Sequence, residues 1–225
     1  MKPTRENVQW VNDQLEQLYG LRKQKSRPDP LEDLITTILS QNTTDTNRDR
    51  AYKSLKAKYS TWEEVYQSDR EELKETIRVA GLGEQKSKAI KASLEWLNEF
   101  HGSLDMNWVC REDPQEMITL FTQIKGIGIK TISIVLCFAC GKDVFPVDTH
   151  VNRVCKRLGL SPGKAAPNRT FRIMADLFPE GKSRSLHLNM ITLGREICKA
   201  RTPRCDECVL LEKCNFGQKE YKKPL

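Results

Sequence analysis

The apolar positions of this chain recur at helical spacing along most of its length. Behind Asp29-Pro30, leucine and isoleucine occupy positions i, i+3, i+4, i+7 and i+8 of residues 31–39, which predicts the buried face of a helix. Aspartate followed by proline is a typical helix start, because the carboxylate caps unpaired N–H groups and proline fits the first turn. No segment shows sustained apolar–polar alternation with hairpin turns. The sequence therefore predicts an all-α fold.

Other helix starts carry similar signals. They are Asp113-Pro114, the capping-box pair Thr61 and Glu64, and the capping-box pair Ser68 and Glu71. Helical periodicity also occurs at residues 8–18 and near residues 149–158, 167–178 and 184–199. We expect two helical domains with discontinuous connectivity. Residues 29–143 would form a helical barrel, and residues 1–28 would pack with residues 144–225.

A five-residue phrase occurs twice in the sequence: apolar, any residue, glycine, apolar, glycine. The two copies are residues 79–83, with Gly81 and Gly83, and residues 124–128, with Lys125, Gly126 and Gly128. Two glycines in a short link between helices let backbone N–H groups point outward beside the next helix N-terminus. Such a link can hold a phosphate oxygen or a bridging cation. This pattern is the helix-hairpin-helix motif, a grip on the DNA backbone, although a plain helix–helix turn also fits it.

Two side chains in the sequence that follows the second copy are suited to chemistry on DNA. Lys130 stands among isoleucines in the first turn of the expected next helix, and a desolvated, neutral amine can attack the anomeric carbon of a sugar. Asp148 precedes a helix expected to begin near Thr149, where it can cap that helix and face a cleft. From spacing alone, a phosphate contact by Lys130 and a simple cap by Asp148 explain these residues better than catalytic roles do.

Four of the eight cysteines have the spacing of a metal site, C-x6-C-x2-C-x5-C. They are Cys198, Cys205, Cys208 and Cys214. Zinc sites with four cysteines usually pair two short knuckles, but only the middle two cysteines form a knuckle here. Wider, unequal loops suit a 4Fe–4S cluster, in which each iron takes one thiolate, and zinc stays open on spacing alone. The remaining cysteines lie among apolar neighbours and are expected to be core thiols; they are Cys110, Cys137, Cys140 and Cys155.

Positive charge is concentrated in one part of the chain. Residues 151–205 contain twelve Lys or Arg and three acidic residues, a net charge of +9, whereas the whole chain has a net charge of +7. This concentration predicts an acidic partner, and it favours nucleic acid over a membrane because no strongly amphipathic basic helix accompanies it. No apolar run approaches transmembrane length and no apolar stretch follows Met1. We therefore expect a cytoplasmic, nucleoid-associated protein that does not bind membranes.

Taken in order, these motifs resemble those of the endonuclease III family of DNA glycosylases. The resemblance rests on G-x-G-x-K-T from Gly126, V-D-T-H-V from Val147 and the four-cysteine spacing, and it covers roughly residues 30–215. It implies the two-domain helix-hairpin-helix glycosylase fold with a 4Fe–4S cluster on the four cysteines. By position, Lys130 matches the nucleophilic lysine of the family. Asp148 matches the aspartate that stabilises positive charge on the sugar and assists deprotonation of the lysine, from the opposite lip of the cleft.

The resemblance also implies an activity and a partner. Family members release a damaged base from double-stranded DNA and nick the resulting abasic site by β-elimination through a lysine Schiff base. Oxidised or ring-saturated pyrimidines are the expected substrates, because a base that has lost stacking is flipped out at lower cost. We expect a monomer in which the cluster is structural. The alternatives are another base specificity (5-methylcytosine, mismatched thymine or 8-oxoguanine), a non-catalytic DNA-binding iron–sulfur protein, and a ferredoxin-like electron carrier.

Three segments depart from the family pattern. Lys125 stands where the family commonly has proline, which adds a positive charge to the second hairpin. The segment 40–45 resembles S-x-Q-x-x-D, but Asn42 occupies the usual glutamine position and Gln41 lies one place earlier. We expect one of these two residues to fill the gap left by the flipped base. The run that begins Phe145-Pro146 also resembles plant 5-methylcytosine glycosylases, so the preferred base stays open.

Overall fold

The structure, a computed structural model, describes residues 1–24 and 26–221. Helices and the links between them make up this whole range, and no strand occurs within it, which confirms the all-α prediction. The chain divides into two compact units, Arg27–Lys142 and Met1–Ser26 with Asp143–Leu225. That each unit is a separate domain stays a prediction. Among the described helices, none has the length and apolarity needed to cross a membrane.

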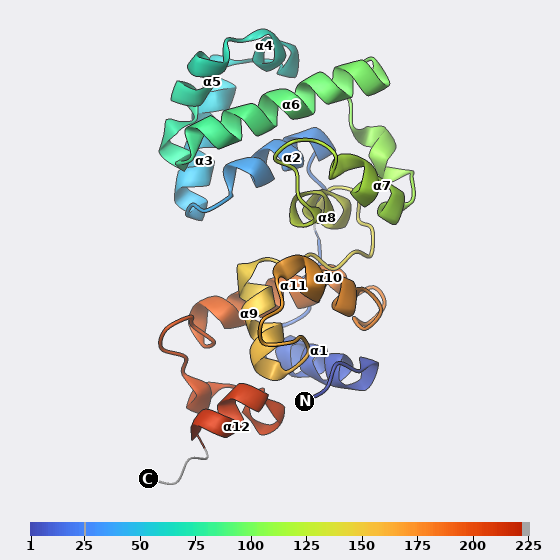
Figure 1. Cartoon of the computed structure of the whole chain (residues 1–225), viewed down its shortest axis with the longest axis vertical. Helices are drawn as coiled ribbons and strands as arrows, with labels where there is room; N and C mark the ends of the chain where they lie inside the picture. Colours follow the sequence, from blue (N-terminus) through green and yellow to red (C-terminus); the bar gives the residue numbers. More distant parts are fainter. Residues whose placement is uncertain (25, 222–225) are drawn as a thin grey trace. The chain divides into compact units, whose positions relative to one another are not determined.

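The unit Arg27–Lys142 is built around its first helix. Its elements are α2 (Pro30–Leu39), α3 (Asp45–Lys58), α4 (Trp62–Gln67), α5 (Arg70–Thr76), η1 (Arg78–Ala80), α6 (Gly83–His101), η2 (Asn107–Cys110), α7 (Pro114–Phe121) and α8 (Ile129–Phe138). Helix α2 packs against α8 and α6, and α7 also packs against α8 (Figure 1). The predicted apolar stripe of α2 is fully buried in this contact; it consists of Leu31, Leu34, Ile35, Ile38 and Leu39.

Three of the four expected helix starts are confirmed. Asp29, Thr61 and Asp113 each accept a hydrogen bond from a backbone N–H in the first turn of α2, α4 and α7. A side-chain acceptor at this place pairs one of the N–H groups that the helix itself leaves unpaired.

The expected capping box of Ser68 with Glu71 is wrong. Asp69 caps α5 instead, and its Oδ1 accepts a hydrogen bond from the Glu71 N–H at 2.8 Å. A carboxylate is favoured over a hydroxyl here because its negative charge faces the positive end of the helix dipole. Ser68 belongs to the end of α4, where its hydroxyl donates to the Val65 carbonyl at 2.7 Å.

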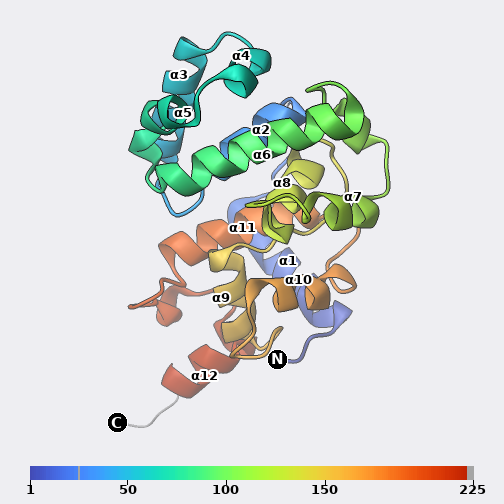
Figure 2. The same cartoon turned by 45° about the horizontal axis from the view of Figure 1, so that its top comes forward.

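The other unit is centred on α11. Its elements are α1 (Arg5–Tyr19), α9 (Thr149–Leu158), α10 (Pro167–Ala175), α11 (Ser183–Glu196), η3 (Cys205–Glu207), η4 (Leu211–Lys213) and α12 (Asn215–Tyr221). Helix α11 contacts both α9 and α1 (Figure 2). The chain after α1 is held by the buried Asn189, which donates to the Gly20 carbonyl at 3.1 Å and accepts from Arg22 Nε at 2.9 Å. These bonds attach the N-terminal segment to the C-terminal part of the chain.

Cys110 and Cys140 form a disulfide, so the expectation that both are core thiols is wrong. The bond joins η2 to the segment that follows α8, across a sequence separation of 30 residues. Closing a loop of this length restricts the unfolded chain and stabilises the fold by about 3.5 kcal/mol in the chain-entropy model. Cys137 and Cys155 are buried thiols, as expected.

Asp33 of α2 is a half-buried acid that the apolar pattern does not reveal. Its Oδ2 is buried and has no hydrogen-bond partner among the described residues. Burial, with a smaller contribution from the neighbouring Glu32 carboxylate, raises the pKa of Asp33 from 3.8 to about 6. The folded protein therefore binds this proton more tightly than the unfolded chain does. Between these two pKa values, the contribution of Asp33 to stability falls as pH rises.

We expect Asp33→Asn to raise the melting temperature at pH 7.5 by about 2–4 °C, which corresponds to about 1 kcal/mol in a chain of this size. The amide removes the cost of a buried charge, so the gain should shrink toward pH 4, where the wild-type carboxyl is protonated. Calorimetry at both pH values measures the difference. Asp49→Asn is the matched control, because the exposed Asp49 carboxylate pairs with Arg48 at 2.8 Å and its loss brings no gain. An equal melting temperature for Asp33→Asn and wild type at pH 7.5 would contradict this account.

Candidate functional site

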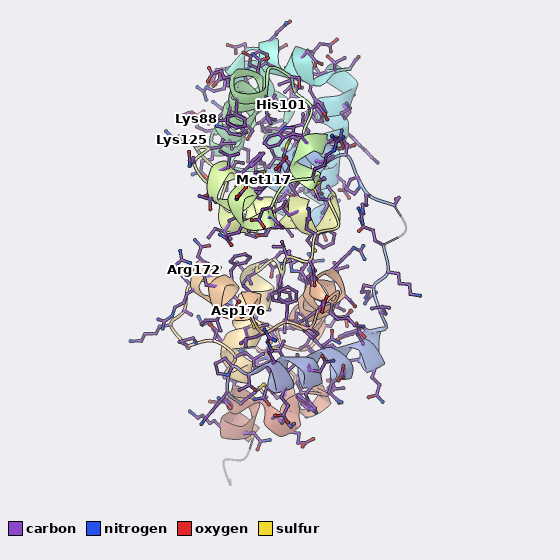
Figure 3. All side chains as sticks on the ribbon, turned by 90° about the vertical axis from the view of Figure 1, so that its right-hand side faces the viewer. Lys88, His101, Met117, Lys125, Arg172 and Asp176 are labelled. Atoms are coloured by element: carbon purple, nitrogen blue, oxygen red, sulfur yellow. A yellow bond between two sulfur atoms is a disulfide. The ribbon has the colours of Figure 1, made fainter. Side chains whose placement is uncertain are left out.

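The second glycine hairpin joins α7 to α8 and lies directly on α6. Gly126 has a φ of +95°, and a Cβ at this position would lie 2.6 Å from the Ala89 Cβ of α6. Glycine is therefore required both by the backbone conformation and by the close approach. Ile124 and Ile127 are buried on either side of Gly126, whereas Lys125 is exposed. Figure 3 shows the Lys125 side chain at the surface of this unit. Ile124 and Ile127 thus anchor the link in the core, and Lys125 faces solvent.

Lys130 lies in the first turn of α8, as expected. Gly128 precedes this helix and supplies no side-chain cap, so the first N–H groups of α8 are available to an external acceptor such as a phosphate oxygen. Lys130 is half-buried, and in the described part of the chain no hydrogen bond or ion pair engages its amine. The amine is thus not committed to a structural partner.

The first glycine hairpin joins η1 to α6 and has a different backbone. Gly81 has a φ of +69°, and Leu82 also adopts the left-handed conformation with a φ of +51°. Leu82 is 44% exposed and, as the N-cap of α6, offers no side-chain hydrogen bond. The N-terminus of α6 is consequently uncapped, like that of α8. Gly83 is the first residue of this helix.

The turn between α2 and α3 contains both candidate gap-filling residues. Asn42 is exposed and has a φ of +50°, whereas Gln41 is half-buried and its N–H donates to the Ile38 carbonyl at 3.2 Å. Asparagine tolerates the left-handed region better than glutamine, because its short polar side chain can interact with the local backbone. The backbone conformation thus gives a physical reason for asparagine at the position where the family commonly has glutamine.

Asp148 is the N-cap of α9, and its Oδ1 accepts a hydrogen bond from the Val151 N–H at 2.7 Å. The segment that leads to it is held by α11, because the buried His187 donates from Nδ1 to the Pro146 carbonyl at 2.8 Å. The sequence did not point to His187, because the buried face of α11 contains other polar residues and a histidine there does not stand out. Lys130 and Asp148 belong to different compact units. That they line one cleft stays a prediction.

The four spaced cysteines line a single pocket in the unit that contains α9 and α11. Arg157, Leu211 and Phe216 also line this pocket. Arg157 comes from α9, and its Nη1 lies 3.3 Å from the Cys198 Sγ. The N–H of Gly217 lies 3.4 Å from the Cys214 Sγ. The sulfur atoms thus lie in a mostly apolar pocket with N–H donors directed at two of them, a setting that stabilises thiolates bound to metal.

Burial dominates the protonation of these cysteines. It raises the pKa of the Cys208 thiol to about 11, and it also raises the pKa values of Cys205 and Cys214. Metal binding must therefore displace protons. Across residues 1–24 and 26–221, no three His, Cys, Asp or Glu side chains form a group suited to one metal ion. In a 4Fe–4S cluster each thiolate binds a separate iron, so the sulfurs surround the cluster instead of converging on one ion. Four cysteines around one pocket fit such a group.

Part of the positive charge in residues 151–205 has a structural role. Arg153 and Arg157 of α9 donate to backbone carbonyls between Gly194 and Ala200. These carbonyls lie at the end of α11 and at the start of the segment from Cys198 to Cys214, here called the cysteine loop. Lys182 pairs with Glu16 of α1 at 2.9 Å. Other basic residues are exposed; they include Lys164, Arg169, Arg172, Lys199 and Arg201. Some of the basic residues thus stabilise this unit through internal hydrogen bonds and an ion pair, and others place positive charge on its surface.

Known proteins are similar to this chain in sequence and in structure. The family model described as HhH-GPD superfamily base excision DNA repair protein matches residues 35–180. An Arabidopsis thaliana protein with a provisional DNA glycosylase name is 34% identical over 191 residues, which are 80% of this chain and only 65% of that protein. Endonuclease III of Sulfolobus acidocaldarius is 35% identical over 187 residues, 81% of this chain and 80% of its own. A solved structure of a trapped endonuclease III–DNA covalent intermediate matches with a TM-score of 0.82 and 28% identity, over 97% of this chain and 99% of that one.

Proposed function

Because this chain belongs to the HhH-GPD superfamily of base excision DNA repair proteins, as a DNA glycosylase/AP lyase of the endonuclease III family, we propose that Lys130 is its nucleophile. The observation that carries this proposal is the state of the Lys130 amine. The Lys130 residue is half-buried and lies in the first turn of a helix with an uncapped N-terminus, and its amine has no hydrogen-bond or ion-pair partner among the described residues. Such an amine beside a phosphate-binding helix end is suited to attack a sugar.

In the proposed reaction, the Lys130 nitrogen forms a bond to C1′ of the flipped nucleotide while the C1′–base bond breaks. The base leaves with the bonding electrons and takes up a proton. Opening of the sugar ring gives a Schiff base, and loss of a C2′ proton then expels the 3′ phosphate, which nicks the strand. Asp148 accepts a proton from the Lys130 ammonium before attack and passes it on to the leaving base, so that the regained carboxylate charge stabilises the cationic sugar. One Asp148 oxygen caps α9, which fixes the orientation of the carboxylate.

The partner is double-stranded DNA, and we assign its phosphates to the two hairpins. The links at Gly81–Gly83 and Gly126–Gly128 each precede a helix whose first turn lacks a side-chain cap, and Lys125 adds an exposed cation to the second link. Gln41 or Asn42 fills the gap in the base stack, since both lie in one short turn between α2 and α3. Because its substrate is genomic DNA, we place the protein in the cytoplasm, at the nucleoid.

The four cysteines would hold a 4Fe–4S cluster, since they line one pocket. When bound, the cluster supplies four metal–thiolate cross-links and a redox-active centre. The protein's own contribution is the support of this loop. Arg157 donates to the carbonyls of Lys199 and Ala200 at 2.7 and 2.9 Å, and it approaches the Cys198 sulfur. We assign the cluster a structural role, because cysteine ligation at every iron leaves no open position for substrate.

Lys130→Gln should abolish strand nicking and borohydride trapping on abasic-site duplexes, because the amide cannot form a Schiff base. DNA affinity should change by less than about threefold, since only one charge among many is lost. Lys125→Gln is the matched control. It removes an exposed lysine five residues away and should weaken binding while trapping at saturating enzyme is retained. Gel assays of trapped adduct measure both variants, and persistent trapping by Lys130→Gln would overturn the choice of nucleophile.

The purified protein should contain about four irons per chain and absorb broadly in the blue region of the visible spectrum. Cys214→Ser should lose most of this iron, because it removes one of the four thiolates around the pocket. Cys155→Ala should keep it, because Cys155 is a buried cysteine outside the pocket lining. Metal analysis of the three proteins checks this expectation. Stoichiometric zinc without iron in the wild type would contradict the cluster.

Duplexes with thymine glycol or dihydrouracil opposite a purine should be cut at least about tenfold faster than those with 5-methylcytosine, 8-oxoguanine or mismatched thymine. Ring saturation removes stacking and lowers the free energy needed to flip the base out, which corresponds to an increase of about ten- to a hundredfold in the rate. Single-turnover rates on single-lesion duplexes provide the measurement, with Lys130→Gln as the blank. Faster release of an intact or a purine base would reassign the substrate and leave the lysine chemistry in place.

A further inference from the structure

Lys86 of α6 is a buried lysine whose ammonium connects two loops. Its side chain is only 1% exposed. Nζ donates to the Leu39 carbonyl at 2.8 Å and to the Ala80 carbonyl at 2.8 Å. Burial lowers the pKa of this amine to about 8. Burying an ammonium is costly unless it is well hydrogen-bonded, so the two carbonyls account for its presence in the core.

The two carbonyls stand at the bases of two proposed DNA-contact loops. Leu39 is the last residue of α2 and leads into the turn that contains Gln41 and Asn42. Ala80 is the last residue of η1 and directly precedes Gly81 in the first hairpin. Carbonyls at the ends of helices lack partners within the helix and need an external donor. One ammonium provides that donor for both loops.

A third bond ties Lys86 to the first hairpin. Its backbone N–H donates to the Leu82 carbonyl at 3.0 Å, at the left-handed residue of that link. Lys86 is therefore bonded to the hairpin through both its backbone and its side chain, and to the α2–α3 turn through its side chain alone. Any shift of one loop against the other must break one of these bonds or move the buried ammonium.

We propose that Lys86 is a positioning residue that fixes the gap-filling turn at Gln41 and Asn42 relative to the phosphate-binding hairpin at Gly81–Gly83. This inference rests on the proposed DNA-contact roles of the two loops. Lys86 itself does not reach DNA, because its side chain is buried. Its effect is to set the distance between the residue that enters the base stack and the backbone amides that hold a phosphate, which lowers the ordering cost of engaging both at once.

Lys91 of the same helix provides a matched control. Its amine donates to the carbonyls of Val65, Tyr66 and Ser68, at the end of α4. Both lysines thus bond to helix-end carbonyls from α6, and burial lowers the pKa of both. Only the Lys86 carbonyls lead into proposed DNA-contact loops. A general loss of stability should therefore follow either substitution, whereas a specific loss of DNA engagement should follow only Lys86→Met.

The first test uses a duplex with 2-aminopurine opposite a tetrahydrofuran abasic analogue, which requires no catalysis. Wild-type protein that fills the gap should change the 2-aminopurine fluorescence. At saturating protein, Lys86→Met should lose most of this change and Lys91→Met should keep it. Equal signals from the two variants would overturn the proposal. If wild-type protein changes the fluorescence but releases no base from any lesion, the proposed function fails while the positioning role is still tested.

The second test is a double-mutant cycle on single-turnover base release. Lys86→Met should slow release by about tenfold, and so should the joint change Gln41→Ala with Asn42→Ala. The combined variant should be little slower than either, because both changes remove the same function. Lys91→Met combined with the same joint change should instead show multiplied effects. Multiplied effects for the Lys86 pair would overturn the proposal. Lys86→Gln, which keeps an N–H donor, is carried through the same cycle and decides the question if Lys86→Met does not fold.

Discussion

The close contact between Gly126 and Ala89 of α6 determines how the second hairpin is presented. A Cβ at Gly126 would lie 2.6 Å from the Ala89 Cβ, so the link can lie this near to α6 only as glycine. Ile124 and Ile127 are buried on both sides of it and hold the link in place. With the apolar residues facing inward, Lys125 faces solvent, and Gly128 at the end of the link leaves the first turn of α8 without a side-chain cap. The position of Lys130 in the first turn of α8 therefore follows from how the hairpin packs on α6.

Helix α6 is the common support of all three proposed DNA-contact segments. Ala89 lies beneath the second hairpin, and Lys86 bonds to both the first hairpin and the end of α2. The same helix buries Ile90, Leu94 and Leu97 in the core. Because close-packed cores resist small displacements, segments attached to one core helix keep fixed spacing. A grip on a regular DNA backbone requires such spacing, since phosphates recur at fixed intervals.

The sequence predicted most of the features that depend on neighbours along the chain, although it placed the cap of α5 at Ser68 instead of Asp69. Asp29, Asp113 and Thr61 cap helices as their local spacing indicates, and the glycine phrases fall in tight links between helices. Features that depend on distant residues were not predicted. The disulfide joins Cys110 to Cys140 only because η2 and the end of α8 meet in the fold. Lys86 is one of many lysines in the sequence, and only the fold reveals that it bonds to carbonyls 47 and 6 residues away. The roles of Lys130 and Asp148 rest on resemblance, because spacing alone fits simpler explanations.

The proposed cluster, although structural, would influence the proposed catalysis through α9. This helix begins at Asp148, whose carboxylate caps it, and later carries Arg153 and Arg157. Both arginines donate to the Cys198 carbonyl, at 3.0 and 3.3 Å, where α11 gives way to the cysteine loop. A loop fixed by metal–thiolate bonds would present these carbonyls to α9 in one arrangement, whereas a metal-free loop would lose its cross-links. Loss of the cluster would then loosen the helix that orients Asp148, even though no iron takes part in the chemistry of the sugar.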